Sequence, residues 1–293
     1  MVKHKTWGSR IFDGFNYAFL LICSLISIIP FVYIVAGSFT AAEEFVKHQF
    51  LLFPTKFSLN AYEYIFSSNV LIHSLGVSVF ITVVGTIVNL AFTSIMAYPL
   101  ARSDLVGRRV VMMMVVFTIL FSGGIIPTFL VVKAAGLLDS IWALIIPGAI
   151  SGFNLILLKN FFQQLPEGLE EAAKIDGCSE YGILFRIVLP LSLPALATFG
   201  LFYGVGHWNT YFNAILYINS PEKWPIQVWL RQIVILSQGG IGDSAQLDSE
   251  FVIPPPRVIN MAVIVVATLP ILAVYPFLQK HFAKGALLGS VKG

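Results

Sequence analysis

The stretch Leu165–Pro190, LPEGLEEAAKIDGCSEYGILFRIVLP, is the most charged segment of a chain that otherwise avoids charge. Its first half predicts a short helix, because Pro166 suits a first helical position and three glutamates in the early turns complement the helix dipole. Gly177 predicts a left-handed stop, and Ser179 can cap the element that follows. One predicted helix face carries only small or apolar side chains, Leu169, Ala172 and Ala173. Another protein surface could approach such a face closely.

The composition around this segment predicts an all-α membrane protein. Hydrophobic residues make up 57% of the chain and charged residues only 11%, against about 25% charged residues in a typical soluble domain. A net charge of +3 is too small to suggest a nucleic-acid partner. Cys23 and Cys178 are far apart, so we expect two free thiols, no disulfide and no metal site. The chain contains no GxxxxGK motif, so it carries no Walker-type ATP site of its own.

Six long apolar runs predict six transmembrane helices within one transmembrane domain covering residues 1–293. The first run is far longer than the core of a signal peptide, which predicts an uncleaved span. Ser122–Gly124 and Pro127 interrupt the third run, and the fifth is too long for one straight span, so a kinked or partly unwound helix is expected there. The expected spans are about 14–40, 71–100, 110–132, 140–160, 184–216 and 258–279.

The basic residues predict the orientation of these spans. Of the eighteen Lys and Arg, twelve fall on the side that holds both chain ends and six on the other. Under the positive-inside rule the acidic loop 163–186 and both termini face the cytoplasm, and the loop 221–257 lies outside. This placement predicts a multi-pass protein of a bacterial cytoplasmic membrane, in contact with lipid.

The order Glu171-Ala172-Ala173, then Asp176-Gly177, then IVLP at 187–190 resembles the EAA loop of ABC-type importer permeases. The aspartate before the glycine is similar to the oligosaccharide branch, which is related to the second permease of the maltose transporter. The resemblance implies that the loop forms a coupling helix seated in a cleft of a cytoplasmic ATPase. The residues implied in this coupling are Glu170, Glu171, Ala172, Ala173, Asp176 and Gly177. The alternative interpretation is an acidic loop that joins two spans by chance.

The same resemblance implies the other components of the transporter. They are a second permease, either a relative or another copy of this chain, two ATPase subunits that bind ATP and Mg²⁺, and an extracytoplasmic sugar-binding protein. This chain itself would bind no cofactor. The stretch FSGGIIPTFL at 121–130 looks most similar to permeases for oligosaccharides derived from complex polysaccharides. The tail 279–293 also resembles this branch, in which the C-terminus reaches the ATPase.

A second candidate site is the polar and aromatic cluster HWNTYFN at 207–213, inside the fifth run. Polar side chains at membrane depth usually face the bundle interior or a wet cavity. Aromatic faces can stack on sugar rings, and amides can pair with hydroxyls. We therefore expect the substrate path to include Trp208, Asn209, Tyr211 and Asn213. The alternative is an aromatic belt at the membrane interface, with the asparagines bonding neighbouring helices.

The outer segment Trp224–Leu236 has apolar residues at helical spacing with polar residues opposite. It predicts an amphipathic helix that either lies on the bilayer surface or, as the resemblance implies, reaches toward the binding protein.

Three other functions stay open at this point. An ion-driven secondary transporter usually needs ionisable groups in its spans, and the six runs offer only His73 and His207. A membrane-embedded enzyme should show a nucleophile–base pair or a metal constellation in the spans, and the sequence shows neither. An ABC importer for a different solute is the third. The favoured prediction is an oligosaccharide permease that performs no covalent chemistry.

Overall fold

The computed structural model describes residues 7–41, 43–44, 52–54, 56–67, 69–237 and 256–290, without the side chains of residues 167, 234, 236, 237, 256, 275 and 277–290. The described residues form helices and turns, with one isolated bridge between Thr40 and Phe57 and no β-strand. This confirms the all-α prediction. The α-helices are α1 Trp7–Ser38, α3 Asn60–Ser67, α4 Asn69–Ala101, α5 Arg108–Leu120, α6 Ile125–Ala134, α7 Gly152–Phe162, α8 Glu167–Ile175, α9 Glu180–Ile183, α10 Leu189–Leu191, α11 Leu193–Trp208, α12 Phe212–Tyr217, α13 Ile226–Ser237 and α14 Pro256–Ser290.

Short helical turns link several of these helices. They are the 3₁₀ turns η1 Ile141–Leu144, η2 Ile146–Gly148 and η4 Pro221–Lys223, and the π-helical turn η3 Leu184–Val188. The glycine- and proline-rich part of the expected outer loop, residues 238–255, lies outside the described residues.

Within the described residues, three helices are long and apolar enough to cross a membrane, and three bent pairs bring the number up to six if each pair is one span. The bends are 119° between α5 and α6, 52° between Ile141–Gly148 and α7, and 83° between Glu180–Leu191 and α11. The expected interruption of the third run and kink of the fifth are thus present. The fourth run also bends, which the sequence analysis did not anticipate. Pro147 and Gly148 directly precede that break, and proline has no N–H to donate to a helical hydrogen bond.

Contacts divide the chain into two units, residues 1–69 with 230–268 and residues 70–229 with 269–293. In the first unit, α1 is exposed along its apolar length, as a helix meant for lipid would be. The turn after α1 is held by stacked aromatic rings. The Phe39 ring centroid lies 5.2 Å from that of Phe57 and 4.9 Å from that of Tyr62, whose hydroxyl is 2.7 Å from Ser38 Oγ.

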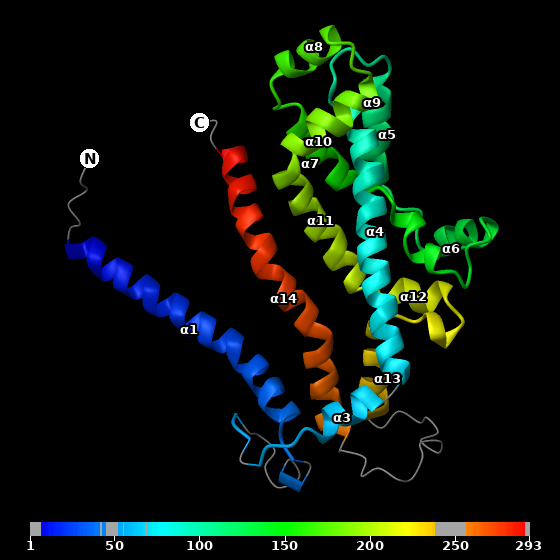
Figure 1. Cartoon of the computed structure of the whole chain (residues 1–293). Helices are drawn as coiled ribbons and strands as arrows, with labels where there is room; N and C mark the ends of the chain where they lie inside the picture. Colours follow the sequence, from blue (N-terminus) through cyan, green and yellow to red (C-terminus); the bar gives the residue numbers. More distant parts are fainter. Residues whose placement is uncertain are drawn as a thin grey trace. The chain divides into compact units, whose positions relative to one another are not determined.

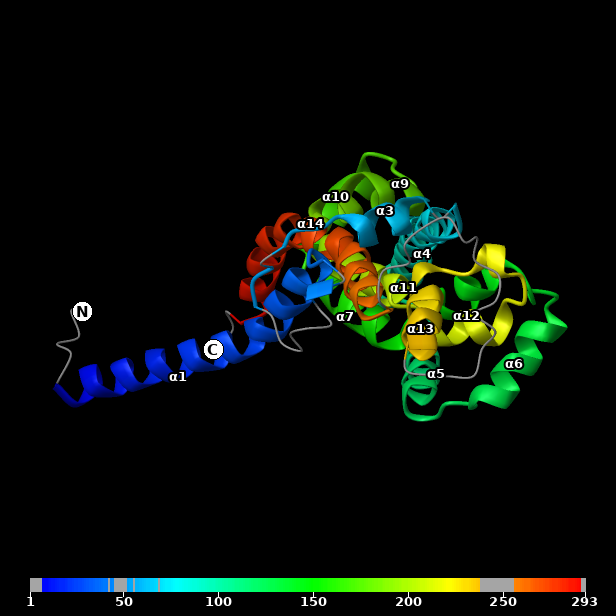
Figure 2. The same ribbon diagram turned by 90° about the horizontal axis from the view of Figure 1, so that it is seen from below.

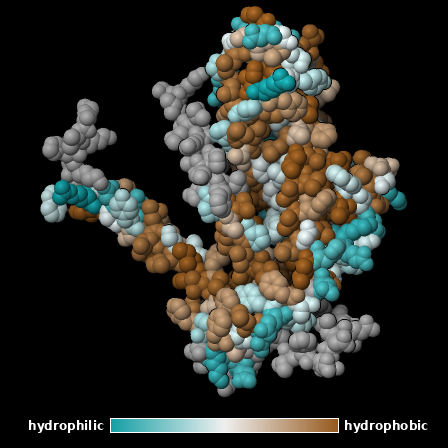
Figure 3. All heavy atoms as spheres, in the orientation of Figure 1, coloured by the Kyte–Doolittle hydropathy of each residue, from teal (hydrophilic) through white to brown (hydrophobic). Residues whose placement is uncertain are grey.

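The second unit is arranged along α4, with α8 and α9 at one end and α12 toward the other (Figure 1). Helix α6 lies at its side next to α12, where the rings of Phe129 and Tyr217 are 6.2 Å apart (Figures 1 and 2). In Figure 3, brown apolar atoms cover the middle of this unit and teal polar atoms gather near its ends. This distribution suits a bundle whose middle is surrounded by lipid.

Small residues bring α4 and α11 close together. A Cβ added at Gly204 would lie 3.4 Å from Thr86 Oγ1, and one added at Gly200 would lie 3.5 Å from Leu90 Cδ1. In a membrane, helices gain little from excluding water, so close packing through small residues supplies much of their association.

Two sets of hydrogen bonds connect the region of the break in the fourth run to α4 and α11. Asn89 Nδ2 donates to the carbonyl of Gly148 over 2.8 Å, and Asn89 Oδ1 accepts from His207 Nε2 over 3.1 Å. One turn further along α4, Thr93 and Tyr203 share a hydroxyl hydrogen bond of 2.8 Å, and the N–H of Ser151 donates to Tyr203 over 3.2 Å. Backbone groups freed by a broken helix must find partners inside a bilayer, and these side chains supply them.

Candidate coupling site and transport path

Helix α8 has the form that the sequence predicts, with its start shifted by one residue. It begins at Glu167, and Pro166 occupies the preceding cap position with φ −60°. At the other end, Gly177 adopts φ +79°. The N–H of Cys178 donates to the carbonyl of Ala173 over 2.9 Å, and the N–H of Gly177 donates to that of Lys174 over 3.0 Å. These two bonds form a Schellman motif, which explains why a glycine stands at this position.

The two alanines of α8 face different ways. Ala173 is only 6% exposed and belongs to the apolar core of its own chain, whereas Ala172 is exposed. In this structure only Ala172 is open to another protein, and the contact of either alanine with an ATPase stays a prediction. Successive residues of a helix are about 100° apart, so neighbouring positions diverge around the axis. The outward face instead continues to Ile175, which is 87% exposed and which the sequence analysis did not single out.

Of the other expected coupling residues, Glu171 and Asp176 are exposed and Glu170 is partly buried. Ser179 caps α9 as predicted, because its Oγ accepts from the N–H of Gly182 over 3.2 Å. Their contact with an ATPase stays a prediction.

Arg102, directly after α4, connects that helix to the acidic loop. Its guanidinium forms an ion pair with Glu180, and its Nε lies 3.9 Å from Glu170 Oε2 and 3.5 Å from Asp104 Oδ1. Tyr98 OH donates to Glu180 Oε2 over 3.1 Å, and Lys174 Nζ lies 3.4 Å from Glu180 Oε1. From the sequence, Arg102 was only one of the twelve basic residues on the side that holds both chain ends. Its position at the end of an apolar run, on the side that also holds the acidic loop, was the available signal.

The charges of this network stabilise one another. Burial alone raises the pKa of the Glu180 carboxyl, but Arg102, the Tyr98 hydroxyl and Lys174 together hold it below its ordinary value. Burial likewise lowers the pKa of Arg102, and Glu180, Tyr98 and Asp104 together outweigh that effect and raise it. Both groups therefore stay ionised throughout the physiological range.

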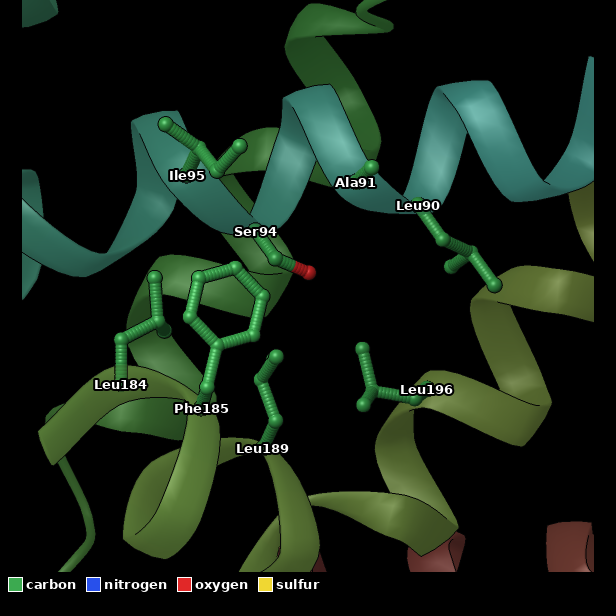
Figure 4. A pocket seen from close by; sticks show the side chains of 8 residues that line it. All are labelled: Leu90, Ala91, Ser94, Ile95, Leu184, Phe185, Leu189 and Leu196. Carbon is green, nitrogen blue, oxygen red and sulfur yellow. The ribbon is translucent and has the colours of Figure 1, made fainter. Parts of the chain in front are cut away.

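A π-helical turn, η3, continues from α9 toward α11. π-helical turns are rare and frequently occur at functional sites. Between this segment and α4 lies an open cavity of about 180 Å³. Its lining, shown in Figure 4, is Leu90, Ala91, Ser94, Ile95, Leu184, Phe185, Leu189 and Leu196. Apart from the Ser94 hydroxyl these side chains carry no polar group, so the cavity does not suit an oligosaccharide.

The expected path cluster is divided by the break between α11 and α12. Trp208 is 4% exposed, so its ring is packed inside the protein and unavailable for stacking on a sugar in this structure. Asn209 and Asn213 are exposed and Tyr211 is partly buried. Asn209 Nδ2 donates to the carbonyl of Val205 over 2.9 Å. The asparagines are thus the members of the cluster that remain suited to contact a solute.

A compact clasp in the second unit joins the turn after α6 to the turn after α12. Asp139, at φ 56°, accepts hydrogen bonds from the N–H groups of Asn219 (3.0 Å) and Ser220 (2.9 Å) and from the Ser220 hydroxyl (2.6 Å). Lys223 Nζ lies 3.1 Å from Asp139 Oδ2. The Ser220 bonds first, and then Lys223, lower the pKa of Asp139 far below its ordinary value. The sequence offered no signal for this clasp beyond a polar turn.

The predicted outer amphipathic helix is present as α13. At its start Ile226 and Val228 are buried, and the N–H of Ile226 donates to Ser78 Oγ of α4 over 2.8 Å. The indole rings of Trp224 and Trp229 are 5.6 Å apart. The first turn is therefore packed against protein, so it does not lie free on a bilayer surface.

Comparison with known proteins agrees with this architecture. The family model described as "Binding-protein-dependent transport system inner membrane component" matches residues 88–287. The polygalacturonan/rhamnogalacturonan transport system permease protein YtcP of Bacillus subtilis is 62% identical over 97% of this chain and 99% of that protein. Protein LplC of the same organism is 58% identical over 99% of this chain and 98% of its own length.

A solved structure provides the corresponding match in three dimensions. A chain in the crystal structure of a bacterial ABC transporter involved in the import of the acidic polysaccharide alginate is 31% identical. It superposes with a TM-score of 0.86 over 94% of this chain and 98% of that chain. The chain therefore belongs to the family of inner membrane components of binding-protein-dependent transport systems.

Proposed function

We propose that this chain is a permease subunit of an ABC importer that moves oligosaccharides into the cytoplasm, and that its substrate is an acidic oligosaccharide. The complete importer contains a second related permease, an extracytoplasmic sugar-binding protein and two ATPase subunits. ATP and Mg²⁺ bind to the ATPases, and this chain carries no cofactor. Both chain ends and α8 face the cytoplasm.

Family membership narrows the alternatives. The family consists of integral membrane transport components, so the chain is a transporter subunit and not an enzyme. Members of this family depend on a binding protein to deliver the solute, whereas an ion-driven secondary transporter binds its solute directly.

The outward face of α8 is the observation that carries the proposal. This helix stands outside the apolar runs, its inner face is fixed by the buried Ala173, and its outer face exposes Ala172 and Ile175. The small Ala172 lets a partner protein approach closely, and the large side chain of Ile175 offers it apolar surface to bury. Membrane lipid cannot cover this face, because glutamates and Lys174 surround it. A cytoplasmic protein such as an ATPase fits these requirements.

The substrate class is supported by two relatives with acidic polymers in their names, a polygalacturonan permease and an alginate importer. Asn209 and Asn213 support it chemically, since an amide can donate to hydroxyls and carboxylates without binding them too tightly for release. Each polar group left without a partner inside the bilayer costs several kcal/mol, so such donors are needed along the path.

Reconstitution tests the proposal. Liposomes that contain the permease pair and ATPases should accumulate oligogalacturonides when ATP and the binding protein are supplied, and malto-oligosaccharides much less. Ala172→Trp should abolish ATP-driven uptake while membrane insertion persists. Val106→Trp is the matched control, because Val106 is 95% exposed on the same side but lies outside α8. Normal uptake by the Ala172→Trp variant would contradict the coupling role of α8, and absence of any ATP-driven sugar uptake by the unaltered complex would contradict the function.

Orientation is tested by labelling two exposed positions in a variant without native cysteines. In sealed right-side-out cells an impermeant thiol reagent should label Glu222→Cys and spare Val106→Cys, while a permeant reagent labels both. The reverse pattern would invert the topology.

A further inference from the structure

The end of α4 receives contacts from three successive parts of the acidic loop. Gln163, before α8, donates from Nε2 to the carbonyl of Ala101 over 3.1 Å. Glu170, on α8, lies within ion-pair distance of Arg102, and Glu180, after α8, pairs with the same guanidinium. The loop therefore encloses the end of this span on both sides of the coupling helix.

Arg102 is the one cation among the described residues that reaches both glutamates. Its side chain is only 18% exposed, and its guanidinium carbon lies 5.8 Å from the centre of the Tyr98 ring. A guanidinium is always charged and presents several donors in a fixed plane, so it can hold two carboxylates of different elements at once. Lysine, with a single mobile ammonium, cannot reproduce this arrangement.

Helix α4 continues from this contact through the unit. Its 33 residues span about 50 Å. Along that length Asn89 and Thr93 are bonded to His207 and Tyr203 of α11, and near the far end Ser78 is bonded to Ile226. A displacement of its cytoplasmic end therefore reaches α11, the broken fourth run and the start of α13 through direct contacts.

We propose that Arg102 is a positioning residue of the coupling step, which joins α4 to the coupling helix through Glu180 and Glu170 so that both move together. Chain continuity alone would deliver a displacement of α8 to α11 by way of the π-helical turn and the 83° bend. Arg102 supplies a second route that bypasses the bend. This inference rests on the proposed function, because the displacement comes from the ATPases.

The test uses the complete importer in liposomes and measures sugar transported per ATP hydrolysed. Arg102→Gln should leave complex assembly and basal ATP hydrolysis unchanged and should lower the transport ratio roughly five- to tenfold, at the lower end of typical coupling between sites. Arg109→Gln is the control, since Arg109 is exposed in the first turn of α5 and makes no ion pair with any described residue. A purely structural role would lower the amount of complex and leave its ratio unchanged.

A reversible bridge provides the second measurement. In a variant without native cysteines, Arg102→Cys with Glu180→Cys should show the reduced transport ratio. A short bis-methanethiosulfonate reagent, which joins the two thiols through disulfide bonds, should restore the ratio until reductant cleaves those bonds. A normal ratio in Arg102→Gln, or no recovery on bridging, would contradict the inference while the proposed function stands. Absence of ATP-driven uptake by the unaltered complex would contradict both.

Discussion

Gly85→Ala is the substitution to which the interior of the second unit should be most sensitive. A Cβ at this position would lie 2.6 Å from Nε2 of His207 and 2.8 Å from both Cδ2 and Cε1. The imidazole is buried and hydrogen-bonded to Asn89, which in turn holds the carbonyl of Gly148. The ring can therefore make room only by giving up that contact.

The expected loss can be worked out against a matched glycine. Gly76 lies on the same helix with no atom within 4 Å of an added Cβ, so Gly76→Ala gains the helical preference of alanine without a clash. Overpacking costs about 1–3 kcal/mol and a lost hydrogen bond between membrane helices about 0.6–1.7 kcal/mol. Gly85→Ala should thus be about 2–4 kcal/mol less stable than Gly76→Ala.

The assay is unfolding of each variant in mixed micelles with increasing SDS, followed by tryptophan fluorescence. Adding His207→Ala to Gly85→Ala removes the clashing ring. His207→Ala should therefore lower the free energy of unfolding much less in the Gly85→Ala variant than in the unaltered chain. Equal stability of Gly85→Ala and Gly76→Ala would show that the ring adapts freely and would refute the close contact between α4 and α11.

Three further substitutions test other parts of the structure. Gly177→Ala forces alanine into φ +79° and should cost about 1–2 kcal/mol, whereas Gly168→Ala, in open space on α8, should be neutral or stabilising in the same unfolding assay. Because Asp139 has a lowered pKa, its contribution to stability is complete above the unfolded value of about 3.9 and is lost as the pH falls through the folded value. Between pH 5 and 8 the clasp should therefore not change how the free energy of unfolding varies with pH. At acidic pH, Asp139→Asn should weaken the loss of stability as the pH falls. An unchanged pH dependence at acidic pH would contradict the clasp. Trp208→Ala should lower folded yield, with a cost of about 3–5 kcal/mol for emptying a buried site, while Asn209→Leu should lower uptake several-fold at normal yield; the opposite pattern would return Trp208 to the sugar path.

Features that depend on neighbouring residues could be predicted before the structure was known. Long uncharged runs require a lipid or protein environment, which was enough for the all-α class. The stop at Gly177 and the cap at Ser179 depend on backbone conformation and donors within a few positions, so the ends of α8 could be read to within one residue. The kink of the fifth run followed from proline and glycine, whose effect is also local.

Tertiary structure alone decided which distant groups meet. Arg102 and Glu180 are 78 residues apart, Asp139 and Ser220 are 81 apart, and Asn89 and His207 are 118 apart. Composition and spacing do not encode such pairings, because each depends on the crossing and rotation of helices that pack as whole bodies. The same rotation buried Ala173 and Trp208 and left Ala172 and Asn209 exposed, although each pair is adjacent in the sequence. A one-residue step turns a side chain by about 100°, and only the packed helix fixes where that turn begins.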